Sequence, residues 1–272
     1  MFSATYGHRA PLCYDARPSM TPKTVFLTGA SSGIGRALAL AYAKKGVRVA
    51  LVARRKAELE GVAAEIRALG GMAVPIVADV AKVHDIEEAL REANDALGGL
   101  DMVIANAGVG SPKHATRLTV AEVVKVVDVN VRGAFVTLVA ALPYLLERKR
   151  GHLVGVSSLA GRRGLPQTGP YSASKAALTT FLETLRLDLA GSGVRVTDVQ
   201  PGFVDTEMSR ATATRPFLWT AERAASHIVE ELRSAPAVVA FPRPLGAAIT
   251  ASRALPDGWV SYLAGKGVGK PR

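Results

Sequence analysis

The amino-acid sequence predicts an α/β fold, a single doubly wound domain in which a parallel seven-stranded sheet carries helices on both faces. Two observations lead to this prediction. From Lys23 onward, short apolar segments rich in valine alternate with longer segments of helical periodicity, which is the pattern of buried parallel strands joined by crossover helices. The first apolar segment also runs directly into a glycine-rich turn that opens a helix, as the first unit of such sheets commonly does.

The predicted strands are short and mostly apolar, as strands buried on both faces of a sheet should be. In chain order they are Thr24–Thr28, Arg48–Ala53, Ala73–Val77, Met102–Ala105, Gly151–Ser157, Val194–Val199 and Ala237–Ala240. Helices are predicted between them, where apolar residues recur at three- and four-residue steps. These helices are Ile34–Lys45, Lys56–Leu69, Val83–Ala96, Val120–Arg148, Tyr171–Ala190 and Thr220–Ser234. Because no repeat or linker-like stretch divides the alternation, we assign residues 22–243 to one domain.

The two ends of the chain differ from the domain between them. Residues 1–21 contain glycine and prolines without a periodic apolar pattern, so we expect a disordered N-terminal extension, with Met20 as a second possible start of translation. Residues 244–272 combine apolar residues at helical steps with an excess of basic residues. We expect a helical, basic extension packed on the same domain, and the alternative is an amphipathic contact with anionic lipid.

Composition places the chain among ordinary globular proteins. Of its 272 residues, 49% are hydrophobic and 21% are charged, which is typical of such proteins. No apolar run approaches the ~20 residues that a membrane-spanning helix needs. The richest segment, Ala134–Leu146, contains Thr137 and Pro143 and is interpreted as a buried helix. The single cysteine, Cys13, excludes an intramolecular disulfide and fits a reducing compartment, so we expect a cytoplasmic protein.

The net charge of +11 raises the question of a nucleic-acid partner. The excess lies in scattered arginines rather than in a basic run, and no DNA-binding motif accompanies it, so we expect no such partner. The same charge would suit a phosphate-rich cofactor or an anionic membrane surface. The five histidines show no metal-ligand spacing, and no metal site is predicted.

The glycine-rich turn reads Thr28-Gly29-Ala30-Ser31-Ser32-Gly33-Ile34-Gly35. Glycines allow the backbone to turn sharply and to approach a pyrophosphate, which then sits at the positive end of the following helix. The spacing T-G-x-x-x-G-x-G differs from the usual G-x-G-x-x-G of dinucleotide-binding folds, but strand, turn and helix occur in the required order. The alternative is a glycine-rich turn without a ligand.

Tyr171 and Lys175 are spaced to share one face of a helix. A phenol titrates near pH ~10, and a neighbouring ammonium favours the phenolate and lowers this pKa. Ser158, thirteen residues before the tyrosine, supplies a hydroxyl that would hold a carbonyl oxygen against the phenol. Ser157 is its rival, and the offset to Tyr171 favours Ser158. The three side chains predict proton exchange with a substrate oxygen.

Together these motifs resemble those of the short-chain dehydrogenase/reductase family, over roughly residues 23–210. The family's motifs recur in order and at family-like spacings: the turn 28–35, Asp79-Val80, Asn106-Ala107-Gly108, Asn130, Ser158, Tyr171 with Lys175, and Pro201-Gly202. One departure is Ala105 before Asn106, where the family commonly has a second asparagine.

The resemblance implies a Rossmann-like fold and a role for each matching residue. Ser158 would hold the substrate oxygen, and Tyr171 would be the general acid in reduction and the general base in oxidation. Lys175 would lower the pKa of Tyr171 and bind the nicotinamide ribose, while Asn130 would link Lys175 through water to solvent. The cofactor would contact Thr28, Gly29, Ser31, Ser32, Gly33, Ile34, Gly35, Asp79, Val80, Asn106, Ala107, Gly108, Tyr171, Lys175, Pro201, Gly202, Val204 and Thr206. Subunits would pair through the helices 120–148 and 171–190 as a homodimer or homotetramer.

The end of the second strand predicts which nicotinamide cofactor binds. Ala53 stands where family members that select NAD commonly have an aspartate, and Arg54 and Arg55 follow it. A carboxylate at this position binds ribose hydroxyls, whereas an arginine accommodates a 2′-phosphate. Because a guanidinium suits bidentate contact with phosphate, we expect NADP(H) rather than NAD(H), bound by Arg54 with help from Arg55.

These inferences predict an NADPH-dependent oxidoreductase that interconverts a ketone or aldehyde with an alcohol. Apolar residues after Thr206 would suit a lipophilic small-molecule substrate, which the fold and motifs do not name. One alternative is reduction of a 3-oxoacyl group on an acidic carrier protein. Another is a non-catalytic NADPH-binding regulatory or scaffold protein, against which the intact Ser158, Tyr171 and Lys175 argue.

Overall fold

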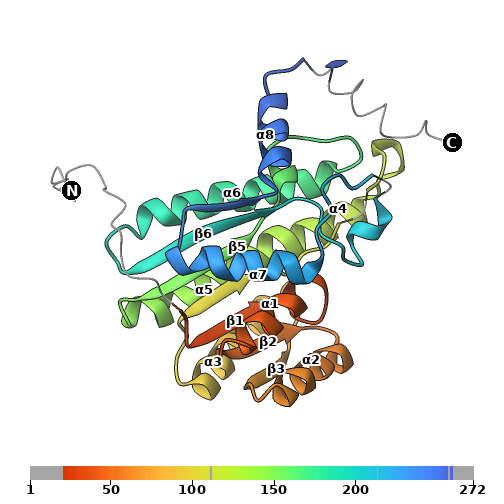
Figure 1. The fold of residues 1–272 in the computed structure, drawn as a ribbon. Helices are drawn as coiled ribbons and strands as arrows, with labels where there is room; N and C mark the ends of the chain where they lie inside the picture. The colour runs from red at the N-terminus through yellow and green to blue at the C-terminus, as the bar shows by residue number, and fades with distance from the viewer. Residues whose placement is uncertain (1–20, 111, 213, 257, 260–272) are drawn as a thin grey trace.

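The structure, a computed structural model, describes residues 21–110, 112–212, 214–256 and 258–259. A seven-stranded parallel sheet forms its centre, in the order β3-β2-β1-β4-β5-β6-β7 (Figure 1). The strands are β1 (Thr24–Thr28), β2 (Arg48–Ala53), β3 (Ala73–Val77), β4 (Met102–Ala105), β5 (Gly151–Val156), β6 (Val194–Pro201) and β7 (Val238–Phe241). The strand order reverses between β1 and β4, and sheets of this type bind ligands beyond the carboxyl ends of the strands at that point.

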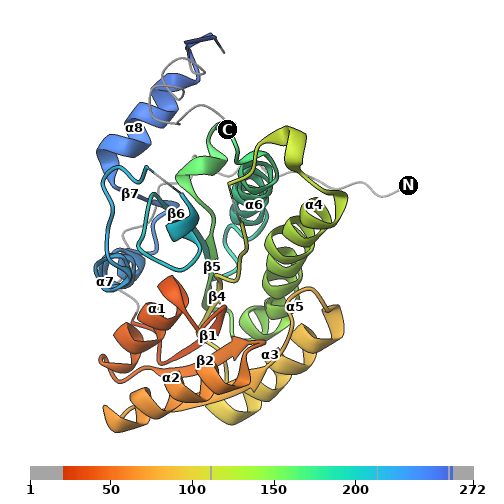
Figure 2. The same cartoon turned by 90° about the vertical axis from the view of Figure 1, so that its right-hand side faces the viewer.

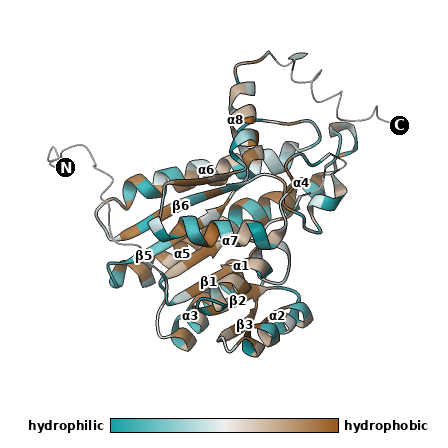
Figure 3. Ribbon diagram, in the orientation of Figure 1, coloured by the Kyte–Doolittle hydropathy of each residue, from teal (hydrophilic) through white to brown (hydrophobic). Residues whose placement is uncertain are grey.

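Helices cover both faces of the sheet (Figure 2). On one face lie α1 (Gly33–Ala43), α2 (Lys56–Ala68) and α7 (Ala221–Glu231). On the other lie α3 (Val83–Leu97), α5 (Ala134–Glu147) and α6 (Gly169–Asp188). Buried apolar side chains fill the space between the sheet and each helical layer, and the central strands are correspondingly brown in Figure 3. The predicted doubly wound α/β fold is confirmed.

The observed elements differ from the predicted ones at a few boundaries. Strands β1 to β4 have the predicted bounds, whereas β6 continues to Pro201 because Pro201 pairs with Phe241 of β7. The helix predicted over Val120–Arg148 is interrupted, since Asp128–Gly133 form a π turn between α4 (Val120–Val127) and α5. A π turn adds one residue to a helical turn and is frequent at functional sites.

The helical run Val120–Glu147 is long and apolar enough, by length and composition alone, to cross a membrane. This run is longer than Ala134–Leu146, the most apolar segment of the sequence, because α4, the π turn and α5 follow one another without a non-helical residue. In its most apolar window, 44% of the residues are buried in the fold, and α5 packs on α3, β4 and β5. Core helices of folded domains meet the same length criterion, and the packing of α5 supports the interpretation of Ala134–Leu146 as a buried helix.

The C-terminal segment begins with α8 (Arg243–Ser252), which stands at one end of the sheet above α6 in Figure 1. It packs on β7 and on the turn Leu159–Gly161 that follows β5. The lipid-contact alternative stays a prediction, and so do the domain boundaries at residues 22 and 243. The predicted disorder before Met20 lies outside the described residues.

Candidate active site

The glycine-rich turn connects β1 to α1 at the point where the strand order reverses. Gly29 has a φ of +69°, and a Cβ there would lie 2.8 Å from Cα of Ala107. A Cβ at Gly35 would lie 2.1 Å from the carbonyl oxygen of Gly29, so the turn requires glycine at both positions. Ser32 precedes α1 without a capping hydrogen bond from its side chain, which leaves the first N–H groups of the helix for an anionic ligand.

Thr28 and Asn106 tie this turn to the end of β4. The Thr28 hydroxyl accepts hydrogen bonds from the backbone N–H groups of Asn106 and Ala107, each at 3.1 Å. The Asn106 side chain donates in return to the carbonyl oxygen of Thr28 at 3.0 Å. The structure thus brings two of the predicted cofactor motifs together at the carboxyl ends of β1 and β4.

Arg54 and Arg55 follow β2 at the same edge of the sheet. Arg54 Nη1 lies 3.8 Å from a carboxylate oxygen of Asp79, the residue expected to meet the adenine. Arg55 donates to the Ser31 hydroxyl at 3.2 Å and its Nη1 lies 3.7 Å from a carboxylate oxygen of Glu207. Both guanidinium groups are largely exposed, so these ion pairs are weak. They form a basic rim beside the glycine-rich turn.

The segment after β6 also contacts the glycine-rich turn. Thr206 packs against the glycine-rich turn, since a Cβ at Gly33 would lie 3.0 Å from Thr206 Cγ2. The side chain of Val204 is buried in the core, and its backbone bridges that of Trp219. Val80, which follows Asp79, is also buried.

Ser158, Tyr171 and Lys175 converge beyond the end of β5. Tyr171 and Lys175 lie on one face of α6, and Lys175 Nζ is 5.7 Å from the centroid of the tyrosine ring. The Ser158 hydroxyl lies 3.3 Å from the carbonyl oxygen of Pro201 and also interacts with the Tyr171 phenol. A hydroxyl, a phenol and an ammonium thus share one site.

Burial controls the protonation of this site. It raises the pKa of Tyr171, and the hydrogen bond with Ser158 offsets only part of the rise. The lowering of this pKa that is expected from Lys175 stays a prediction, and in this structure Lys175 Nζ donates to the carbonyl oxygen of Val156 at 2.8 Å. Burial lowers the pKa of Lys175 to about 8, and the negative charge of Asp198 opposes that fall. At neutral pH the phenol is protonated and the lysine is mostly charged.

Asn130 lies fully buried in the π turn. Its amide nitrogen donates to the carbonyl oxygen of Val109 at 2.8 Å and to the Ser174 hydroxyl at 3.0 Å. Its amide oxygen accepts from the backbone N–H of Val109 at 2.7 Å. The side chain therefore holds the backbone after Asn106-Ala107-Gly108 against α6, and the water link to Lys175 stays a prediction.

Ser157 points away from this site. Its hydroxyl donates to the carboxylate of Asp198 at 2.5 Å in the protein interior, so the geometry favours Ser158 as the substrate-facing serine. Sequence analysis missed Asp198 and its neighbour Gln200, both of which are buried. A signal was present, because Asp198 and Gln200 are two polar residues at alternate positions of a strand, where their side chains share one face.

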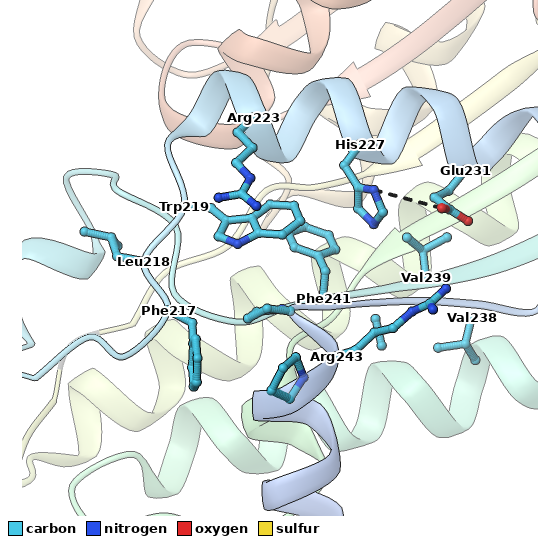
Figure 4. Close-up of a pocket in the computed structure, with 13 residues that line it drawn as sticks. Phe217, Leu218, Trp219, Arg223, His227, Glu231, Val238, Val239, Phe241 and Arg243 are labelled. Carbon is cyan, nitrogen blue, oxygen red and sulfur yellow. Dashed lines mark ion pairs between the residues drawn. The ribbon is translucent and has the colours of Figure 1, made fainter.

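A separate cavity of about 730 Å³ lies along β7 and α7 (Figure 4). Trp219 stacks on Phe241 there with ring centroids 4.8 Å apart, and Arg223 lies over the Trp219 ring at 4.1 Å. None of the predicted site residues lines this cavity. Among the residues that the structure describes, no three histidine, cysteine, aspartate or glutamate side chains gather closely enough to hold a metal ion.

Comparisons with known proteins concern the chain as a whole. A family model described as short chain dehydrogenase matches residues 23–216. An uncharacterized oxidoreductase of Myxococcus xanthus (strain DK1622) is 46% identical over 242 residues, which cover 88% of this chain and 94% of the relative.

Two solved structures resemble the whole sheet and its helices. One is a 3-ketoacyl-(acyl-carrier-protein) reductase from Brucella melitensis complexed with NADH, with 28% identity and a TM-score of 0.73 over 80% of this chain and 95% of that one. The other is an alcohol dehydrogenase from Thermococcus sibiricus complexed with 5-hydroxy-NADP, with 29% identity and a TM-score of 0.73 over 80% of this chain and 94% of that one.

Proposed function

This chain belongs to the short-chain dehydrogenase/reductase family, and on that premise we propose that it is an NADPH-dependent oxidoreductase that interconverts a ketone or aldehyde with an alcohol. Family members bind NAD(H) or NADP(H), and both cofactor types occur among the similar structures. The observation that supports the proposal best is the convergence of Ser158, Tyr171 and Lys175, with the lysine beside Gly108 in the segment after β4.

The described residues fit a phosphate-bearing dinucleotide. The turn at Gly29 and Gly35 leaves no space for a Cβ and exposes the first N–H groups of α1 to an anion. Arg54 and Arg55 place two exposed guanidinium groups at the rim where a 2′-phosphate would lie. This rim supports NADP(H) over NAD(H). When bound, the cofactor supplies the hydride.

The protein's own side chains would handle the proton and the substrate oxygen. Tyr171 is protonated at neutral pH because burial raises its pKa, so it is ready to donate a proton to the oxygen of a carbonyl substrate. Ser158 would donate a hydrogen bond to the same oxygen and stabilise the charge that develops on it. The ammonium of Lys175 would stabilise the tyrosinate that remains after the proton has left.

The proposal is tested by following NADPH oxidation across ketones and aldehydes of graded size and polarity, with NADH in parallel. Tyr171→Phe removes the proton donor and should lower kcat by about 10² to 10⁴ without preventing NADPH binding. Tyr144→Phe on α5 is the matched control and should leave kcat unchanged.

The outcomes separate enzyme from binding protein. Turnover that requires NADPH and is lost in Tyr171→Phe supports the proposal. Tight NADPH binding without turnover of any carbonyl would favour the regulatory or scaffold alternative, and equal use of NADH would overturn the cofactor preference.

Reduction of a 3-oxoacyl group on a carrier protein is a second candidate. It is favoured by the similarity to the Brucella melitensis reductase and by the net charge of +11, which would attract an acidic carrier. The test compares one 3-oxoacyl group on a carrier protein and on a small thiol. A carrier preference that weakens as salt is added would support this candidate, whereas equal kcat/KM would exclude it.

A further inference from the structure

Asp198 on β6 is a buried carboxylate beneath the candidate active site, with 1% of its surface exposed. It accepts hydrogen bonds from the Ser157 hydroxyl at 2.5 Å, the Thr179 hydroxyl at 2.9 Å and the Gln200 amide at 2.6 Å. A buried charge is costly unless its hydrogen bonds are satisfied. The three donors meet that requirement.

The orientation of Gln200 makes a carboxyl oxygen of Asp198 its hydrogen-bond acceptor. Arg162 donates from Nε to the amide oxygen of Gln200 at 2.7 Å, and a guanidinium can only donate. The amide nitrogen of Gln200 must therefore face Asp198, whose oxygen is the acceptor.

Each partner of Asp198 adjoins a residue of the proposed reaction. Ser157 immediately precedes Ser158, and Thr179 lies one helical turn after Lys175 on α6. Gln200 precedes Pro201, whose carbonyl oxygen lies 3.3 Å from the Ser158 hydroxyl. One carboxylate thus connects the serine turn, the catalytic helix and the end of β6.

We propose that Asp198 is a positioning residue of this site, which fixes the Ser158 turn against α6 and supplies the negative charge that keeps the buried Lys175 protonated. The inference rests on the proposed function for its kinetic consequence, whereas the charge state of Lys175 is a property of the protein alone.

The surroundings of Lys175 make Asp198 its principal anion. The titratable groups that face the lysine are Tyr171 on its own helix and Asp198 on β6. β5 offers the carbonyl oxygen of Val156, and the segment after β4 offers the backbone of Gly108. Because burial already lowers the pKa of Lys175 to about 8, with Asp198 acting against it, loss of the Asp198 charge should lower the pKa of the lysine further.

The test is an NMR titration of the lysine side chains, labelled with ¹³C at Cε, in the full-length protein without substrate. Lys175→Met assigns the Lys175 signal. Asp198→Asn should move the Lys175 midpoint down by about one pH unit or more. Thr179→Val is the matched control, since it removes one hydrogen bond to Asp198 and keeps the charge, and it should leave the midpoint in place.

The kinetic arm follows kcat against pH for the same variants. In Asp198→Asn the fall of kcat at alkaline pH should begin about one pH unit lower than in the wild type, with KM changed less than kcat. Should Asp198→Asn fail to fold, Asp198→Ser is smaller, keeps a hydroxyl for Thr179 and carries the same test.

Two results would overturn the inference: an unchanged Lys175 midpoint in the Asp198 variants, or an equal shift in Thr179→Val. A shifted midpoint in a protein that reduces no carbonyl would support the Asp198–Lys175 relation and contradict the proposed function. Carbonyl reduction by a protein whose Lys175 midpoint does not shift in the Asp198 variants would support the proposed function and contradict the Asp198–Lys175 relation.

Discussion

Neighbouring residues with the same chemistry take different roles in this site because their side chains face different surroundings. Ser157 and Ser158 are adjacent in the chain, yet the hydroxyl of Ser157 donates to the buried Asp198 while that of Ser158 interacts with Tyr171. Alternation along an extended backbone turns consecutive side chains to opposite sides. The direction of each side chain, rather than its chemistry, therefore decides which serine can reach a substrate.

Alanine at each of the two positions should separate the two roles. Ser158→Ala should lower kcat by about 10², as loss of a donor to a developing oxyanion does, with little change in stability. Ser157→Ala should instead destabilise the fold by about 2 kcal/mol, because the charged Asp198 loses a buried donor. Steady-state kinetics and urea unfolding of both variants check this, and a larger kcat loss in Ser157→Ala would reverse the assignment.

The basic rim at the end of β2 leads to a prediction about cofactor choice. Arg54→Asp replaces a phosphate donor by a carboxylate that favours ribose hydroxyls. Since a hydrogen bond to a charged group contributes about 1.5 to 3 kcal/mol, the NADPH/NADH ratio of kcat/KM should fall at least about tenfold. Arg67→Asp makes the same charge change on the exposed face of α2 and should leave the ratio unchanged. An unaltered NADPH/NADH ratio in Arg54→Asp would show that Arg54 does not bind the 2′-phosphate.

At the scale of elements, the pair β5–β6 organises the interior of the site. These strands run parallel with Gly155 beside Asp198 and His152 beside Arg195, so β5 leads to Ser158 at one end and carries a buried histidine at the other. His152 lies against the Thr197 hydroxyl at 2.8 Å. Burial, with the nearby Arg195, lowers its pKa to about 3.

His152 should make the stability of the strand pair depend on pH. The unfolded chain binds a proton near pH ~6.5 that the folded protein accepts only near pH 3, so stability is complete above ~6.5 and falls as the pH drops. Between pH ~7.5 and ~5.5 this group alone should remove about 1.4 kcal/mol. Urea unfolding at both values should show a smaller loss in His152→Gln than in the wild type. The exposed His84→Gln should retain the wild-type loss.

At the scale of the whole molecule, one helix presents an apolar face to solvent. Val120, Val124 and Val127 recur on one side of α4, and Val120 is 81% exposed. α4 also lies beside α6, the second helix through which subunits are expected to pair. An exposed apolar stripe of this kind favours association with another chain, and the expected homodimer or homotetramer would cover it.

Charges placed on this stripe should therefore separate the subunits. Val124→Glu combined with Val127→Glu should reduce the mass measured by sedimentation velocity to that of a single chain, because association would bury two unpaired carboxylates in each subunit. Val83→Glu, on the exposed start of α3, is the control and should leave the mass unchanged. A wild-type mass in the double variant would place the interface elsewhere.

The sequence by itself determined the features that depend on local spacing. The seven valine-rich segments predicted the sheet, and four of the strands have the predicted bounds because buried strands end where polar turns begin. The four-residue step from Tyr171 to Lys175 placed both on one helical face. The glycines at 29 and 35 marked a turn that no other residue could form.

Only the tertiary structure decided the features that depend on residues far apart in the chain. The contact between Ser157 and Asp198 spans 41 positions and follows from the register of β5 with β6, which no local pattern specifies. The same holds for the rise in the pKa of Tyr171, because burial is a property of the packed site and outweighs the hydrogen bond with Ser158. The π turn at Asn130 likewise joins α5 to the backbone at Val109 through side-chain hydrogen bonds. Spacing along the chain fixes which side chains share an element, whereas packing fixes which of them are dehydrated and which meet.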